Sequence, residues 1–223
     1  MSAQRNVYVP KHFDTLNVIV LYSSHSAKNT KFPNIDINGK NLTRHHYDLI
    51  KKRFNNEKQL NIIYVYGNEN DIHKHVPNDV TVLINENYES NGDSRSLNLA
   101  LYNCKIQNCL IIDGKHVWSD NMLDNVTKAD FSSSFVLLGK DCDNSIGSII
   151  DENKTPELLM FNSPNKYSGV TFISEQSMPA LRKMTTNKNT HKLLTFELIN
   201  DILKKDKTIK AILDNTIRTE SCL

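Results

Sequence analysis

Three polar segments of the sequence contain the residue types that could surround a phosphate chain. They are Ser23 to Lys31, Asn85 to Ser96 and Asp113 to Trp118. Lys28 and Lys31 lie among small residues, where backbone N–H groups and ammonium groups together can cradle a triphosphate. This combination of side chains predicts a loop that binds phosphate.

Asp113 could supply the second requirement of such chemistry. Transfer of a nucleotidyl group needs charge neutralisation at the α-phosphorus, which is usually provided by Mg²⁺ on carboxylates. Asp113 ends an apolar run and is followed by Gly114, so it is a candidate ligand. The attacking phosphate must also be held in line, because positioning and electrostatics supply most of the rate.

The polar segments follow short apolar runs that predict buried strands. Each run is rich in β-branched residues, which suits a strand covered on both faces. Amphipathic helical patterns separate the runs, with Thr43 and Ser94 as the expected N-caps. Strands and helices alternate, and ligands of such sheets bind beyond the carboxyl ends of the parallel strands. The expected strands are 16–22, 60–66, 80–84 and 109–113, and the expected helices are 42–54 and 94–102.

The second half of the sequence has short strand patterns separated by turn residues, followed by helical ones. The predicted fold is therefore α/β, with a mixed, mainly parallel central sheet, helices on both faces, and an antiparallel extension in the C-terminal half. No repeat or Pro-, Gly- or Ser-rich linker interrupts the chain, so residues 1–223 are expected to form a single domain. The expected strands here are 135–138, 148–150, 158–161 and 169–173, and the expected helices are 178–184 and 193–203.

Composition excludes several classes of protein. The formal net charge is only +2, with no basic stripe, so nucleic acid is not an expected partner. No apolar run approaches the roughly 18 residues of a membrane helix, and the N-terminus is too polar for a signal peptide. None of the four cysteines forms a CxxC pair, which argues against a zinc ribbon. We expect a cytoplasmic protein with reduced thiols, and a homo-oligomer remains open.

Several motifs together resemble those of the nucleotidyltransferase family, which includes the sugar-1-phosphate nucleotidyltransferases and the phosphocholine cytidylyltransferase-like members. Leu21 to Lys28 is similar to the family's AAGxGxR loop, and Asn85 to Ala100 is similar to its NxxYxxxNNxxSLxxA segment. Order and spacing, rather than any single motif, carry the resemblance, which covers roughly residues 16–216. The other matching segments are Asn38 to Leu42, Ile62 to Gly67, Leu110 to Lys115, Tyr167 to Ser174 and Leu213 to Thr216.

The resemblance implies a GT-A-type fold and a reaction. The reaction joins an NTP, with CTP or UTP favoured, to a phosphorylated small molecule such as a phosphocholine-like compound or a sugar phosphate, and releases pyrophosphate. By this likeness Lys28 would steady the triphosphate and Lys31 would stabilise charge at the α-phosphate. The remaining implied roles are nucleotide binding by Ser23, Ser24, Ser26, Gly92 and Ser96, acceptor binding by Tyr88 and Glu197, and Mg²⁺ binding by Asp113 and Asp214.

The sequence departs from the family pattern at the phosphate loop and at the metal site. Ser24 and Ser26 stand where the loop has glycines, which permit closer backbone approach than serine does. Lys115 stands where the family has an acid, so it could neutralise phosphate in place of a metal. Two alternatives remain open. One is a GT-A-type glycosyltransferase that uses Asp141 and Asp143, which form a DxD pair, and the other is an inactive binding or assembly protein that retains the fold.

Overall fold

The computed structural model describes residues 15–23, 35–55, 59–68, 76–139 and 145–214, and the backbone of 219–221. Within these residues the main sheet has seven strands in the order β12-β8-β11-β6-β1-β4-β5. Their bounds are β1 Leu16–Leu21, β4 Leu60–Tyr66, β5 Val80–Ile84, β6 Cys109–Asp113, β8 Phe135–Gly139, β11 Tyr167–Ile173 and β12 Lys210–Asp214.

Four α-helices and three small two-stranded sheets accompany this main sheet in the described part of the chain. The helices are α1 Leu42–Arg53, α2 Asp93–Asn103, α3 Met178–Thr186 and α4 Thr195–Lys205, with a 3-10 turn at Lys188–Thr190. The small sheets pair β2 Asp36–Ile37 with β3 Lys40–Asn41, β7 His116–Trp118 with β13 Thr219–Ser221, and β9 Ile146–Ile150 with β10 Pro156–Phe161.

The topology confirms the predicted mixed, mainly parallel sheet. Strand β1 is parallel to both β4 and β6, and β4 is parallel to β5. Strand β11 runs antiparallel to β6 and β8, which is the antiparallel element expected in the C-terminal half. Strand β12 lies beyond β8 and is parallel to it, a pairing that the sequence did not predict. Strands β9 and β10 pair with each other rather than extending the main sheet.

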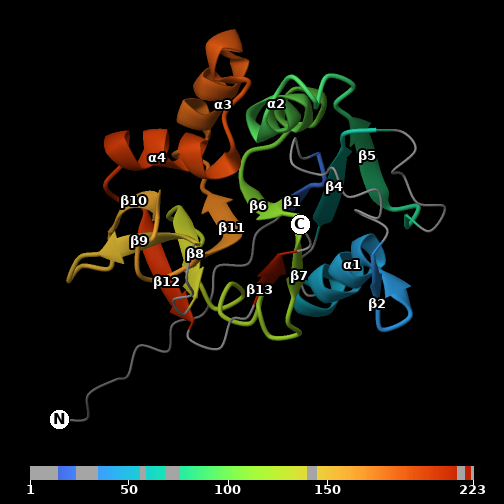
Figure 1. Cartoon of the computed structure of the whole chain (residues 1–223), viewed down its shortest axis with the longest axis horizontal. Coiled ribbons are helices and arrows are strands. Elements are labelled where there is room, and N and C mark those ends of the chain that lie inside the picture. The colour runs from blue at the N-terminus through green and yellow to red at the C-terminus, as the bar shows by residue number, and fades with distance from the viewer. Residues whose placement is uncertain are drawn as a thin grey trace.

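Helices cover both faces of the sheet (Figure 1). On one face α1 packs with residues around Trp118 and Phe131 against alternate residues of the strands. On the other face α2, α3 and α4 pack against the intervening residues, such as Ile19 and Ile111. Since successive side chains of a strand point to opposite faces, each central strand feeds both cores, which explains its continuous apolar run. No helix in the described residues is long and apolar enough to cross a membrane.

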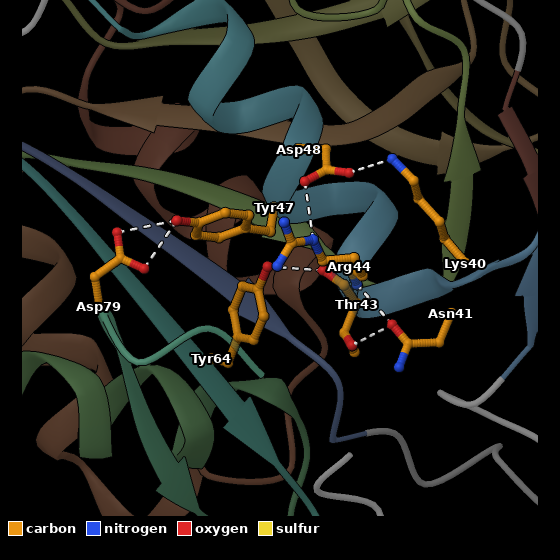
Figure 2. A network of polar contacts seen from close by, with 8 residues as sticks. All are labelled: Lys40, Asn41, Thr43, Arg44, Tyr47, Asp48, Tyr64 and Asp79. Atoms are coloured by element: carbon orange, nitrogen blue, oxygen red, sulfur yellow. Dashed lines mark hydrogen bonds and ion pairs between the residues drawn. The ribbon is translucent and has the colours of Figure 1, made fainter. Parts of the chain in front are cut away.

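The start of α1 differs in detail from the sequence expectation (Figure 2). The N-cap is Asn41, not Thr43, because the Asn41 side chain accepts a hydrogen bond from the Arg44 backbone N at 2.8 Å. The Thr43 hydroxyl instead donates to Asn41 Oδ1, and its carbonyl accepts from the buried Tyr64 hydroxyl at 3.0 Å. The first turn of α1 is thus tied to β4 from below, while an Arg44–Asp48 ion pair lies on its exposed side.

Candidate active site

The polar segments that follow β1, β5 and β6 lie at one edge of the sheet. The Gly114 backbone N donates to Leu21 O at 3.0 Å, which joins the end of β6 to the end of β1. The Asn85 backbone N donates to Tyr66 O at 2.8 Å, which joins the start of the second polar segment to the end of β4. The carboxyl ends of adjacent parallel strands therefore bring the described parts of all three segments together, as the topology requires.

A buried hydroxyl cluster forms where two of these segments meet. Ser23, two residues after β1, contacts the Ser96 hydroxyl of α2 through its own Oγ. Asn85 Nδ2 donates to Ser96 Oγ at 3.0 Å, and all three side chains are almost fully buried. Ser23 and Ser96, which the sequence assigned to nucleotide binding, are thus in contact with each other across 73 residues of chain.

Helix α2 begins at a glycine because no side chain would fit there. Gly92 is its N-cap, and a Cβ at this position would lie 2.5 Å from the carbonyl oxygens of Lys192 and Leu193. The Gly92 backbone N donates to His191 O at 2.7 Å. Ser94, the expected cap, is instead buried in the first turn, and its hydroxyl has no hydrogen-bond partner among the described residues.

Asp113 forms an ion pair with the basic residue two positions later. Its Oδ1 accepts a hydrogen bond from the Lys115 backbone N at 3.0 Å, and its Oδ2 lies 3.3 Å from Lys115 Nζ. His116 Nδ1 is 3.8 Å from the same Oδ2. Burial alone would raise the pKa of Asp113, but the charges of Lys115 and His116 and the hydrogen bonds from Lys115 outweigh it and hold the pKa below its ordinary value.

A second buried carboxylate, Asp93, lies beside this pair. Its Oδ2 accepts hydrogen bonds from the Thr195 backbone N at 3.1 Å and from Thr195 Oγ1 at 2.9 Å. Burial raises the pKa of Asp93, and this effect exceeds the opposing attraction of Lys115. The two carboxylates near Lys115 therefore have pKa values shifted in opposite directions.

The carboxylates face a cavity of about 360 Å³ that combines charged groups with an apolar wall. Lys115, His116 and Lys166 supply basic groups to the lining. The rings of Phe161 and Phe196 meet edge to face in the wall, with centroids 6.0 Å apart. The remaining lining residues are Asp93, Asp113, Ser145, Ile146, Tyr167, Gly169, Leu194 and Thr195.

Gly169 allows β11 to approach Asp113 closely. Its φ is +82°, a conformation that side chains with a Cβ rarely adopt, and a Cβ here would lie 2.9 Å from Asp113 Cβ. The glycine of the YSG motif is therefore required on two separate physical grounds, the backbone conformation and the space.

The two residues implied for acceptor binding lie outside the lining of this cavity. The Tyr88 ring packs on Gly67, where an added Cβ would be 2.6 Å away, and its hydroxyl donates to Glu89 at 3.4 Å. Glu197 Oε2 accepts a hydrogen bond from the Leu194 backbone N at 2.8 Å, which caps α4. Glu197 thus shapes the helix that carries Thr195 and Phe196, and the acceptor roles of Tyr88 and Glu197 stay predictions.

Asp214, the other implied metal ligand, is the last residue of β12. It pairs with Gly139 of β8, and its Oδ2 accepts a hydrogen bond from Asn125 Nδ2 at 2.5 Å. By alternation along the strand its side chain shares a face with Ile212, which packs in the core under α1, whereas Asp113 shares a face with Ile111 in the other core. The two carboxylates leave the sheet on opposite faces.

These side chains do not fit a Mg²⁺ ion well. Both carboxylate oxygens of Asp113 already interact with Lys115, so an ion there would have to displace or adjoin an ammonium group. No cluster of three or more His, Cys, Asp and Glu side chains able to hold a metal ion occurs in the described part of the chain. A shared Mg²⁺ on Asp113 and Asp214 stays a prediction that this geometry does not favour.

Several predicted residues lie outside the described part of the chain. They are Ser24, Ser26, Lys28 and Lys31 of the phosphate loop, and Asp141 and Asp143 of the DxD pair. Sequence reasoning in turn missed Asp93, Lys166, Phe161 and Phe196. Lys166 could have been found, because it directly precedes the YSG motif. No local sequence pattern indicated that Phe161 and Phe196 would line the cavity.

The mixed seven-stranded sheet with its helices has a nucleotidyltransferase-like α/β fold, which comparison with solved structures shows. No family profile and no curated protein sequence matches the chain significantly. Solved structures do match it over most of its length. They include the CTP:phosphocholine cytidylyltransferase of Streptococcus pneumoniae, with a TM-score of 0.71 and 16% identity over 91% of this chain and 92% of that one.

Two further structures have the same fold. The inositol-1-phosphate CTP transferase of T. maritima matches with a TM-score of 0.73 and 11% identity, over 94% of this chain and 90% of its own. A protein of Bacillus anthracis assigned as a glucose-1-phosphate thymidylyltransferase matches with a TM-score of 0.72 and 13% identity, over 92% and 89%. At such identities the likeness establishes the fold.

Proposed function

We propose that the protein is a nucleotidyltransferase that joins an NTP to a phosphorylated small molecule and releases pyrophosphate. The observation that carries this proposal is the cavity of about 360 Å³ at the carboxyl edge of the sheet, in which basic groups and an aromatic wall lie together. The Ser23–Ser96 cluster is nearby, because Ser96 is about one helical turn from Asp93 and Ser23 is two residues beyond Leu21, which pairs with Asp113. We place the acceptor in this cavity and the nucleotide on the side of the Ser23–Ser96 cluster.

The reaction follows from how the two substrates would be held. An acceptor phosphate oxygen in the cavity forms a bond to the α-phosphorus, and the bond from that phosphorus to the bridging oxygen of pyrophosphate breaks. Lys28 would steady the triphosphate and Lys31 the charge that develops at the α-phosphate, while Ser23, Gly92 and Ser96 border the nucleotide. The protein's contribution is in-line positioning and fixed charge, which supply most of the rate in such transfers.

The lining favours some acceptors over others. Phe161, Phe196, Ile146 and Leu194 offer no hydrogen bonds from their side chains, so a polyhydroxylated sugar would leave hydroxyl groups unpaired against them. A methylated ammonium head group would gain contact with the aromatic faces. We therefore favour a phosphocholine-like acceptor over a sugar phosphate, with CTP or UTP as the nucleotide. Two of the structurally similar proteins are named as CTP-using transferases, which supports the choice of CTP.

Pyrophosphate release tests this function directly. Purified protein is incubated with each NTP and a panel of choline phosphate, other phosphorylated amino alcohols and sugar 1-phosphates. We expect release with one pair of substrates and its loss in Lys31→Ala. Lys204→Ala, which changes an exposed lysine of α4, is the matched control and should turn over normally. Unchanged turnover in Lys31→Ala would remove the role assigned to Lys31.

The same panel separates the alternatives. Transfer or hydrolysis of a nucleotide sugar without pyrophosphate would favour the glycosyltransferase that uses Asp141 and Asp143. Binding of nucleotide without any turnover would favour an inactive binding or assembly protein. The cytoplasmic location and self-association stay predictions of the sequence.

A further inference from the structure

Lys115 is held in place on the wall of the cavity. It lies in the tight turn between β6 and β7, and its backbone N and its Nζ contact the two oxygens of Asp113 separately. The Lys115 and Asp113 side chains are only 13% and 15% exposed. A lysine held at both its backbone N and its Nζ has lost most of the rotamer freedom that a surface lysine has.

A second carboxylate strengthens this hold. Asp93 lines the same cavity and attracts Lys115 electrostatically. Burial lowers the pKa of Lys115, but the charges of Asp113 and Asp93 outweigh burial and keep the ammonium group protonated. The cavity wall therefore carries a permanent, oriented positive charge between two carboxylates.

A divalent cation would need the same position. Mg²⁺ demands near-octahedral oxygen ligands at about 2.0–2.1 Å and in transferases is usually bound by one or two carboxylates plus substrate phosphate. The carboxylate that would bind it, Asp113, is paired on both oxygens with Lys115. The Lys115 ammonium group and a divalent cation would therefore compete for the same carboxylate, Asp113.

We propose that Lys115, positioned by Asp113 and Asp93, is a built-in cation that occupies the place of a divalent metal and binds a phosphate oxygen of substrate in the cavity. The identity of the substrate in this proposal depends on the proposed function. The exclusion of metal depends only on the contacts of Lys115 with Asp113.

Binding of Mn²⁺ to the nucleotide-free protein, measured by electron paramagnetic resonance, tests the exclusion of metal. We expect the Asp113→Asn variant and the wild-type protein to bind Mn²⁺ equally, because Asp113 holds no metal in the wild type. Lys115→Asp should create one new Mn²⁺ site, which binds on the order of tenfold or more tightly than any Mn²⁺ binding by the wild type. The substitution replaces an ammonium group, which repels the ion, with a carboxylate that can bind it. Adding Asp113→Asn to Lys115→Asp should abolish that new site. Wild-type binding that disappears in Asp113→Asn would overturn the proposal.

Lys115→Gln keeps the test decisive if Lys115→Asp does not fold. It removes the charge without adding a carboxylate, and we expect a weaker new Mn²⁺ site that again depends on Asp113. Circular dichroism and the urea midpoint establish that each variant is folded.

Binding of inorganic phosphate in EDTA tests the phosphate contact. Calorimetry should show weaker binding in Lys115→Gln than in the wild type, and equal binding would overturn this part. Neither measurement needs turnover, so failure of the pyrophosphate assay would refute the proposed function while these results still decide the role of Lys115.

Discussion

Lys115 Nζ lies 3.3 Å from Asp113 Oδ2, and this pair joins the end of a central strand to the cavity beside it. The contact connects two levels of the molecule. It satisfies a carboxylate at the end of β6, and it holds an ammonium group in the lining of the cavity. Structural and functional consequences of changing either residue can therefore be measured separately.

Breaking this pair should cost stability that a second substitution restores. Lys115→Met leaves a largely buried carboxylate unpaired, and we expect a loss of about 2–3 kcal/mol in the free energy of unfolding. This is less than the ~3–5 kcal/mol typical of fully buried pairs, because both side chains retain some exposure. Asp113→Asn combined with Lys115→Met should recover most of the loss. Urea denaturation of the four proteins measures the coupling, and purely additive effects would contradict it.

Gly169 and Gly39 form a matched pair for a test of close packing. Both have φ of +82°, but a Cβ meets Asp113 Cβ at 2.9 Å in the first and nothing within 4 Å in the second. Gly39→Ala should therefore cost about 1 kcal/mol, from backbone strain alone. Gly169→Ala should cost about 2–4 kcal/mol, since strain and overpacking add. Equal losses in urea unfolding would show that β11 moves away from Asp113 freely.

His46 predicts a stability that falls on acidification. Its ring is fully buried, stacks on Trp118 with centroids 3.7 Å apart, and lies 2.8 Å from the Tyr22 hydroxyl and 2.9 Å from His116 O. Burial lowers the pKa of His46 to about 3. The folded state therefore stays neutral where the unfolded state binds a proton, so its contribution is complete above about pH 6.5 and declines as pH falls toward 3.

The slope of this decline can be measured. Between about pH 6 and pH 4 it should reach up to about 1.4 kcal/mol per pH unit, in addition to the effects of other groups. His46→Gln should be less stable at pH 7, because it loses the stacked ring, but it should lack this part of the slope. Urea midpoints across the pH range give the comparison, and an identical slope in both proteins would show that His46 protonates in the fold.

The aromatic wall predicts an effect on the acceptor alone. Phe196→Ala should raise the KM for the acceptor on the order of tenfold, with the KM for NTP little changed, because Phe196 lines the cavity that we propose holds the acceptor. Tyr102→Ala is the control, since Tyr102 is 85% exposed on α2 and lines no part of the cavity. Steady-state kinetics with each substrate varied measures both values, and a parallel rise in both would contradict the assignment.

Much of this fold was predictable because the central strands carry their signal locally. Leu16 to Leu21 is a continuous apolar run because both of its faces are buried, and its length matches one strand. Strand β12 was missed because it lies at the sheet edge, where Lys210 and Leu213 are exposed and the lysine interrupts the apolar run. A sequence distinguishes a central strand from an edge strand only by how continuous the apolar run is, because that run reflects burial on both faces.

The candidate site was predictable in part, for a related reason. Asp113 and Ser23 could be placed because they lie at or just after the carboxyl ends of neighbouring strands. The Asp93–Thr195 contact spans 102 residues, and one sequence holds no information on which distant residues pair. The N-cap at Asn41 rather than Thr43 shows the local limit, since both residues can cap and only the entry angle of the chain decides.

The beginnings of α2 and α4 are fastened together by a short run of bonds: Gly92 to His191, Ser94 to Leu193, and Asp93 to Thr195. Helix α2 lies on the proposed nucleotide side, and α4 carries Phe196 of the aromatic wall. Because these hydrogen bonds join the two N-termini, a tilt of one helix would move the other, and the two sides of the cleft would shift together. Binding of either substrate would therefore restrict both helices, and each substrate is expected to strengthen the binding of the other.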